Sequence, residues 1–166
     1  PRSGTKWLST YLTYGEWRCG HEEATHFRGI DDVRSWLAQD FTGTVETAAA
    51  PFWRVLREYA PQTRVATIRR PVGQVVDSFL RAGLVVNPDR LRALLEKHDR
   101  KLDQIEARWP NVRRWRHTEL GGATGGKAVF EWALQRPWDQ QWWQSLVNIH
   151  IRKDLRHEVR YYQAYE

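Results

Sequence analysis

The first residues of the chain combine a tight turn with groups that bind anions. Residues 1–7 read PRSGTKW and lead into apolar residues at helical spacing. Small residues before a helix let main-chain N–H groups converge on an anion at the helix N-terminus. Arg2, Thr5 and Lys6 would add two positive charges and a hydroxyl group there. The segment indicates a phosphate or sulfate site, and the structural alternative is a basic turn that only caps a helix.

A second basic segment stands at the end of an expected strand. Residues 64–69 (RVATIR) are typical of a buried strand, Pro71 then begins a helix, and Ser78 lies two turns into it. Arg69 and Arg70 therefore stand at the carboxyl end of the strand, which is where α/β folds bind ligands. Their alternative role is a solvated charge pair.

A third segment carries groups that can move protons. Residues 18–23 read RCGHEE, and a positioned carboxylate or imidazole can serve as a general base. The alternative is a metal site made of His21, Glu22, Glu23 and His26. The two histidines are five positions apart, which differs from the HExxH spacing that places two histidines one helical turn apart. We therefore expect no metal.

Together these segments resemble the sulfotransferases that use 3′-phosphoadenylyl sulfate (PAPS). The resemblance covers PRSGT-x-W and a strand-end arginine that precedes a serine, as Arg70 precedes Ser78 with seven residues between them. RCGHEE resembles the RCGEE segment of the tyrosylprotein sulfotransferases, which also begin with PRSGT. Two positions depart from the family pattern, because Lys6 replaces Thr or Ser and His21 replaces Glu.

The resemblance implies a role for each matching residue. Glu22 falls on the catalytic base with His21 as second candidate, and the strand-end arginine with Ser78 would hold the 3′-phosphate. The family's proline position favours Arg69 and the spacing to Ser78 favours Arg70, so both stay candidates. Trp7 would stack on adenine, and Arg2 would also contact the bridging oxygen as a catalytic residue. The residues that would hold the 5′-phosphosulfate are Arg2, Ser3, Gly4, Thr5 and Lys6.

The implied activity is transfer of a sulfuryl group from PAPS to a hydroxyl-bearing acceptor of unknown class, without a metal. The implied fold is a P-loop-type, three-layer α/β fold, with a parallel sheet flanked by helices and a helix-rich C-terminal part.

Two functions of other classes compete with this one. Residues 121–127 (GGATGGK) fit the G-x-x-x-x-G-K pattern of an ATP-dependent kinase, but Ala128 stands where the magnesium-binding Ser or Thr belongs. These glycines can also be interpreted as a flexible connecting loop, or as a loop with a supporting role over a bound nucleotide. The second competitor is a non-catalytic nucleic-acid-binding or structural module, because the 166 residues carry a net charge of +6 with 21 arginines and 5 lysines.

Composition excludes several other classes. A single cysteine, Cys19, rules out an internal disulfide framework, and no apolar run reaches the ~20 residues that a membrane span needs. No signal-peptide pattern is visible, so we expect a cytoplasmic protein.

Strands that alternate with helices predict an α/β fold with a parallel sheet in a single domain over residues 1–166. Residues 15–29 are expected to be irregular. Asp31 or Asp32 should cap the second expected helix, and Asn87-Pro88 should begin the longest one. The expected helices cover residues 4–14, 31–41, 47–59, 71–81, 88–110 and 127–135, with a last one after residue 137. The expected strands cover residues 43–46, 64–69 and 112–117.

Three further features carry expectations. Four tryptophans near the C-terminus should form core or a contact between copies in a homo-oligomer, with an acceptor groove as the alternative. They are Trp132, Trp138, Trp142 and Trp143. Glu46 and Thr47 follow a strand, where they would face the substrate or cap a helix. If Pro1 begins the phosphosulfate loop, the strand that leads into that loop lies upstream, and we expect the natural chain to extend by about 5–10 residues.

Overall fold

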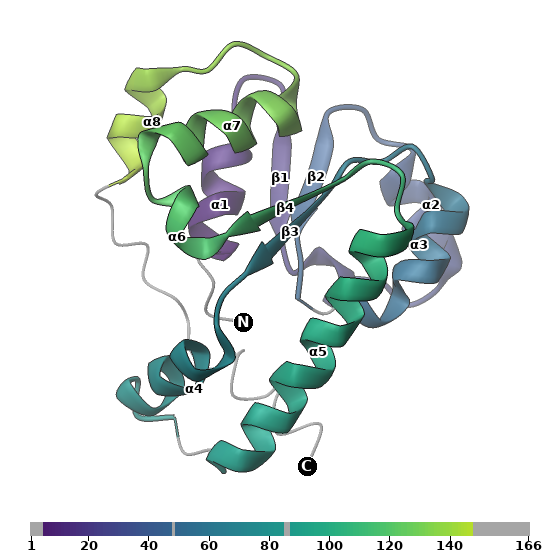
Figure 1. The fold of residues 1–166 in the computed structure, drawn as a ribbon. Coiled ribbons are helices and arrows are strands. Elements are labelled where there is room, and N and C mark those ends of the chain that lie inside the picture. Colours follow the sequence, from purple (N-terminus) through teal and green to yellow (C-terminus); the bar gives the residue numbers. More distant parts are fainter. Residues whose placement is uncertain (1–4, 48, 85–86, 148–166) are drawn as a thin grey trace.

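Four short strands form two parallel pairs in the computed structural model, which describes residues 5–47, 49–84 and 87–147 (Figure 1). In the first pair β1 (Arg18–His21) lies beside β2 (Thr42–Val45), and in the second β3 (Val65–Arg69) lies beside β4 (Val112–Arg116). Each pair is joined through helices, as parallel strands require. The α/β class and the parallel pairing are confirmed. Within the described ranges, however, the strands make two separate sheets.

Helices make up most of the remaining structure. They include a single 21-residue helix, α5, which runs along the molecule in Figure 1. The helical elements are α1 (Thr5–Leu12), η1 (Glu23–His26), α2 (Ile30–Leu37), η2 (Ala50–Phe52), α3 (Trp53–Tyr59), α4 (Val72–Arg81), α5 (Pro88–Arg108), α6 (His117–Leu120), α7 (Ala123–Leu134) and α8 (Gln140–Val147). None of the helices in this part of the chain combines the length and apolar character needed to cross a membrane.

Local signals placed most of these elements correctly. The carboxamide oxygen of Asn87 accepts hydrogen bonds from the N–H groups of Asp89 and Arg90, which fixes the start of α5. Pro71 directly precedes α4, whose Val75 and Phe79 are buried.

Three expectations about elements were wrong. The segment expected to be irregular contains β1, which is held by pairing with β2 and not by strong strand propensity. Helix α2 has Gly29 at its N-cap, because Asp32 instead accepts a hydrogen bond from the main-chain N–H of Arg28 at 2.7 Å. Helix α7 begins at Ala123, before the expected start at Lys127.

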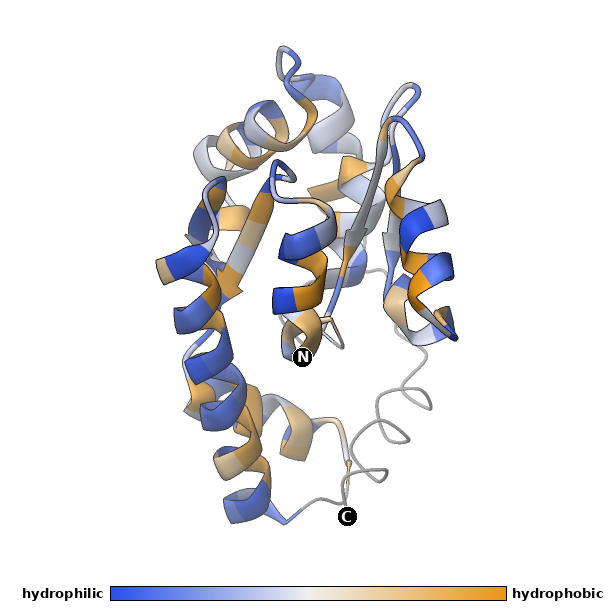
Figure 2. Cartoon of the chain, turned by 90° about the vertical axis from the view of Figure 1, so that its right-hand side faces the viewer, coloured by the Kyte–Doolittle hydropathy of each residue, from blue (hydrophilic) through white to orange (hydrophobic). Residues whose placement is uncertain are grey.

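The buried side chains form three groups. The largest lies where α1, α7 and α8 meet the ends of β2 and β4, with Tyr11 and Phe130 fully buried at its centre. A second lies where η2 and α3 meet α5 and includes Trp53 and Ile105. The third joins α4 to the first half of α5 through Phe79. Figure 2 shows α5 with hydrophobic residues interleaved among hydrophilic ones, as expected for a helix with one buried face.

The tryptophans near the C-terminus pack against the largest group, so they contribute to the core. The indole N–H of Trp138 donates to the Tyr11 hydroxyl at 2.8 Å, and that of Trp142 donates to the main-chain carbonyl of Tyr11 at 3.0 Å. These bonds fasten α8 and the segment before it to α1. An additional role in contacts between copies stays a prediction.

Candidate functional site

The N-terminus of α1 lies against the carboxyl end of β1. Thr5 is buried at the first position of α1, and its Oγ1 lies 3.0 Å from Nε2 of His21, the last residue of β1. Lys6 is exposed beside it. Residues Arg2, Ser3 and Gly4 of the expected phosphosulfate loop lie outside the described residues. The structure therefore brings together the PRSGTKW and RCGHEE segments, which are 16 positions apart at this contact.

Two glutamates bind the ends of β1 and β2 to each other. Glu22, which follows β1 with a left-handed φ of 58°, accepts a hydrogen bond from the main-chain N–H of Thr47 at 2.9 Å. Glu46, which follows β2, accepts one in return from the main-chain N–H of Ala24 at 2.9 Å. Each carboxylate thus holds the loop that follows the other strand. We call this pair of contacts the glutamate clasp.

Glu46 is the more perturbed member of the clasp. Its Oε1 also accepts a hydrogen bond from the Thr44 hydroxyl at 2.6 Å, whereas its buried Oε2 has no hydrogen-bond partner in the described part of the chain. Burial raises the pKa of Glu46 to about 7, and the nearby negative charge of Glu22 contributes to the rise. A carboxyl group with this pKa can exchange a proton near neutral pH.

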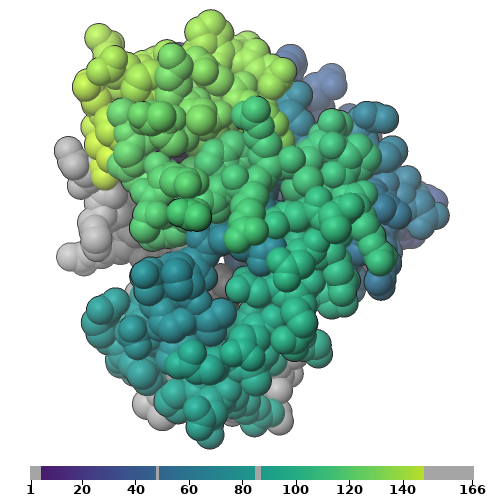
Figure 3. Space-filling view, in the orientation of Figure 1, coloured from purple at the N-terminus to yellow at the C-terminus, as the bar shows by residue number. Residues whose placement is uncertain are grey.

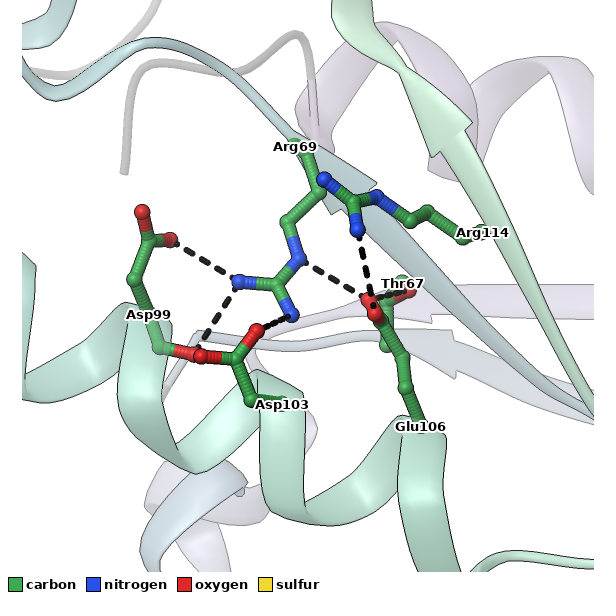
Figure 4. Close-up of polar contacts among 6 residues, drawn as sticks. All are labelled: Thr67, Arg69, Asp99, Asp103, Glu106 and Arg114. Atoms are coloured by element: carbon green, nitrogen blue, oxygen red, sulfur yellow. Dashed lines mark hydrogen bonds and ion pairs between the residues drawn. The ribbon is translucent and has the colours of Figure 1, made fainter.

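Arg69 is occupied by contacts within the fold (Figure 4). Its Nε donates to Glu106 at 2.8 Å, its Nη2 to Asp103 at 2.7 Å, and its Nη1 to Asp99 at 3.3 Å. Burial alone would lower the pKa of Arg69, but these carboxylates on α5 outweigh it and raise the pKa. All three guanidinium nitrogens are engaged, so this side chain locks β3 to α5.

Arg70, directly after β3, lies in a different environment. It lines a cavity of about 540 Å³ together with Thr5, Glu46, Thr47 and His98. The cavity therefore collects residues from the N-terminus of α1, from the ends of β2 and β3 and from α5. Figure 3 shows a hollow in the surface. On one side of it lie α4 and the start of α5, and on the other side lies the rest of the molecule. Ser78 lies on α4 and does not line this cavity.

His98 is a residue that sequence reasoning missed. It lies on α5, and burial lowers the pKa of its imidazole to about 4, with the positive charge of Arg69 acting in the same direction. It is therefore neutral at physiological pH. No local signal marked it, because a histidine in a charged helix resembles any surface residue. The sequence carried a clearer signal for Glu46 as a site residue, since a carboxylate directly after a strand stands at the ligand-binding edge of a parallel sheet.

Trp7 packs inside the protein. Its ring stacks on Tyr11 with the centroids 4.9 Å apart, and its indole N–H donates to the main-chain carbonyl of Leu146 at 3.0 Å. One ring face is therefore covered by Tyr11. The role of Trp7 in stacking on adenine stays a prediction.

The glycine-rich segment lies partly inside a helix. Gly125, Gly126 and Lys127 belong to α7, and the N–H of Gly126 donates to the carbonyl of Gly122 at 2.8 Å. A Cβ at Gly125 would overlap the main-chain carbonyl of Glu119. These glycines permit close packing, and at least one amide that a phosphate-binding loop would present is already used.

The described residues do not support thiol or metal chemistry at this site. Burial raises the pKa of the Cys19 thiol to about 12, so it is protonated and a poor nucleophile. Among residues 5–47, 49–84 and 87–147, no three His, Cys, Asp or Glu side chains converge in a way that could hold a metal ion.

Comparison with known proteins adds no family to these observations. No family model, curated protein or solved structure matches the chain.

Proposed function

We propose that the chain transfers a sulfuryl group from PAPS to an acceptor hydroxyl. The observation that carries this proposal is the contact between Thr5 and His21. It joins the segment that the resemblance assigns to phosphosulfate binding and the segment that it assigns to the base. Arg70 and Thr5 line one cavity, so a ligand with anionic groups at both ends can contact both.

The residues present suit such a ligand. Thr5 and Lys6 at the N-terminus of α1 would hold the 5′-phosphosulfate, together with Arg2, Ser3 and Gly4. Arg70 would hold the 3′-phosphate, because it lines the cavity, whereas Arg69 is shared among three carboxylates. The role expected for Ser78 in holding this phosphate stays a prediction, because Ser78 does not line the cavity. When bound, PAPS supplies a sulfuryl group whose sulfur bonds to the acceptor oxygen while the sulfur–phosphate oxygen bond breaks, and the electron pair leaves with 3′,5′-ADP.

The residues of the RCGHEE segment would handle the proton. Glu22 would take the proton of the acceptor hydroxyl, with His21 as second candidate. Glu46 would stand beside Glu22 as a neutral carboxyl below about pH 7, so it adds little repulsion to a bound anion. Lys6, Thr5 and the N–H groups at the N-terminus of α1 would stabilise the charge that develops on the leaving phosphate.

Calorimetric titration of the protein at its full natural length with 3′,5′-ADP, without magnesium, tests the proposal. We expect saturable binding that Arg70→Ala weakens at least ~10-fold, since loss of a charged hydrogen bond removes about 1.5–3 kcal/mol. Arg113→Ala, at an exposed position of β4, is the matched control and should bind normally. Absence of binding by the folded protein would refute the proposal.

The same instrument separates the competing functions. A kinase would bind ATP only with magnesium and would lose that binding in Lys127→Ala. A nucleic-acid-binding module would bind oligonucleotides with an affinity that falls steeply with salt and survives Arg2→Ala. The contact between Lys127 and Glu131 on α7, at 3.9 Å, favours neither the kinase nor the nucleic-acid-binding module.

A further inference from the structure

The cavity extends into the gap between β2 and β3 and reaches the glutamate clasp at the end of β2. Glu46 and Thr47 line it there, whereas Glu22 does not. Thr5 and Arg70, which the proposed function assigns to the two anionic ends of the ligand, border the same cavity. Of the two carboxyl groups in the clasp, that of Glu46 is therefore the one that a ligand in the cavity can contact.

The two carboxyl oxygens of Glu46 have different surroundings. Oε1 accepts hydrogen bonds from the Thr44 hydroxyl at 2.6 Å and from the main-chain N–H of Ala24 at 2.9 Å, so the fold fixes the orientation of the carboxyl group. Oε2 is buried and has no hydrogen-bond partner among the residues that the structure describes. A buried polar atom without a partner costs free energy unless a ligand or a proton satisfies it. One oxygen is thus engaged in the fold, and the other can serve the cavity.

Glu46 also differs from the other ionisable groups that border the cavity, which are Cys19, Arg64, Arg70, His98 and Asp99. Burial keeps the Cys19 thiol protonated, with a pKa of about 12, and the His98 imidazole neutral, with a pKa of about 4. Arginine side chains keep their proton in proteins. Asp99 is paired with Arg69 at 3.3 Å.

Near neutral pH, Glu46 is the member of this group that changes its charge. Burial raises its pKa to about 7, and the Glu22 carboxylate adds to the rise, while the hydrogen bonds that Glu46 accepts oppose it. A group that is partly ionised at the working pH can both accept and return a proton. Position, orientation and charge therefore all distinguish Glu46 as a group that can handle a proton in the cavity.

We infer that Glu46 is the acid–base residue of the cavity, whose carboxyl group exchanges a proton with the bound ligand while Glu22 holds the loop that carries it through the N–H of Thr47. In the proposed reaction, the ionised carboxylate accepts the proton of the acceptor hydroxyl. The hydroxyl oxygen bonds to sulfur as the bond from sulfur to the bridging phosphate oxygen breaks, and the proton on Glu46 then passes to water. This step rests on the proposed function, and it places Glu46 ahead of Glu22 as the base.

Proton uptake on binding of 3′,5′-ADP tests the contact between Glu46 and the ligand. Calorimetric titration at pH 7 in two buffers that differ in ionisation enthalpy gives the number of protons taken up per bound nucleotide. The negative charge of the nucleotide favours the protonated form of Glu46, so the wild type should take up about half a proton more than Glu46→Gln. Glu96→Gln, at an exposed position of α5, is the matched control and should behave as the wild type does. Equal uptake by the wild type and Glu46→Gln overturns the inference.

Chemical labelling tests Glu46 without a nucleotide. Dicyclohexylcarbodiimide is an apolar reagent that reacts with protonated carboxyl groups, because its central carbon bonds to a carboxyl oxygen as the proton moves to its nitrogen. In the folded wild type, mass spectrometry should find Glu46 modified in preference to the exposed Glu96, and the modification should fall at least ~10-fold between pH 6 and pH 9. Absence of modification at Glu46 overturns the inference. Modification at Glu46 in a protein that does not bind 3′,5′-ADP supports the inference and refutes the proposed function.

Discussion

Two adjacent arginines show how far identical side chains can differ in role. Arg69 is about nine-tenths buried and shared among three carboxylates of α5, whereas Arg70 lines the cavity. Arg69 is the last residue of β3 and contacts α5, whereas Arg70 follows the strand at the border of the cavity. The charge that locks the fold and the charge that borders the cavity therefore occupy neighbouring positions.

Substitution separates the two roles. Arg69→Ala should lower the free energy of unfolding by about 3 kcal/mol, because it leaves Glu106 partly buried without its main counter-charge. Arg70→Ala should unfold much closer to the wild type and lose 3′,5′-ADP binding instead. Urea unfolding of both variants provides the comparison. Equal stability losses would show that Arg69 does not hold β3 to α5.

Glu46 should make stability depend on pH in an uncommon direction. Its folded pKa of about 7 lies above its ordinary value of 4.5, so the folded state binds the extra proton between these values. The stability that this proton contributes is fully present below about pH 4.5 and is lost as pH rises through about 7. Glu46→Gln keeps an oxygen for Thr44 and Ala24 and cannot ionise. Relative to the wild type, the free energy of unfolding of Glu46→Gln should therefore rise by about 1–2 kcal/mol between pH 5 and pH 8.

Thermal unfolding across this pH range measures the difference. Glu96→Gln removes one negative charge from an exposed position on α5 and controls for the change in net charge. If the difference between wild type and Glu46→Gln is the same at pH 5 and pH 8, Glu46 does not titrate in this interval.

At the scale of elements, the glycines of residues 121–126 act through packing. Gly125 lies where α7 passes the main chain of Glu119, and a Cβ at Gly126 would lie 2.5 Å from the indole nitrogen of Trp143. A repeat of glycines can thus satisfy a phosphate-loop pattern while serving close contact between α6, α7 and α8.

Gly125→Ala should therefore destabilise the protein by about 1–3 kcal/mol, because main chain cannot easily move away from the new methyl group. Gly73→Ala is its matched control, since a Cβ there would meet nothing within 4 Å and alanine favours the helix α4. The control should be neutral or stabilised by about 0.5 kcal/mol. Chemical denaturation measures both, and an unaffected Gly125→Ala would mean that α6 and α7 are not held at this spacing.

The success of sequence reasoning depended on how local each signal was. Asn87-Pro88 and Pro71 carry their information within one turn, and both placed their helices correctly. Strand β1 was missed because only its pairing with β2 makes RCGH extended. The spacing of Asp99, Asp103 and Glu106 resembles a solvated helix face. Their common partner lies 30 or more positions away, so no local pattern reveals it.

At the scale of the whole molecule, the candidate site depends on contacts between distant parts of the chain. The first residue of α1, the ends of β2 and β3, and the middle of α5 all border one cavity. Helix α8 is fastened to α1 through Trp7 and Trp142, so the last described helix also supports the first one. The two-sheet arrangement could not be predicted from motifs, because each motif specifies one strand end and none specifies the gap between β2 and β3.

The glutamate clasp has a consequence for protein engineering. Because Glu22 holds the loop after β2 and Glu46 holds the loop after β1, neither loop is an independent module. A graft that replaces residues 22–29 with those of another protein would remove the anchor of Thr47, even though the loop after β2 is untouched. Chimaeras that replace either loop should therefore exchange both loops together.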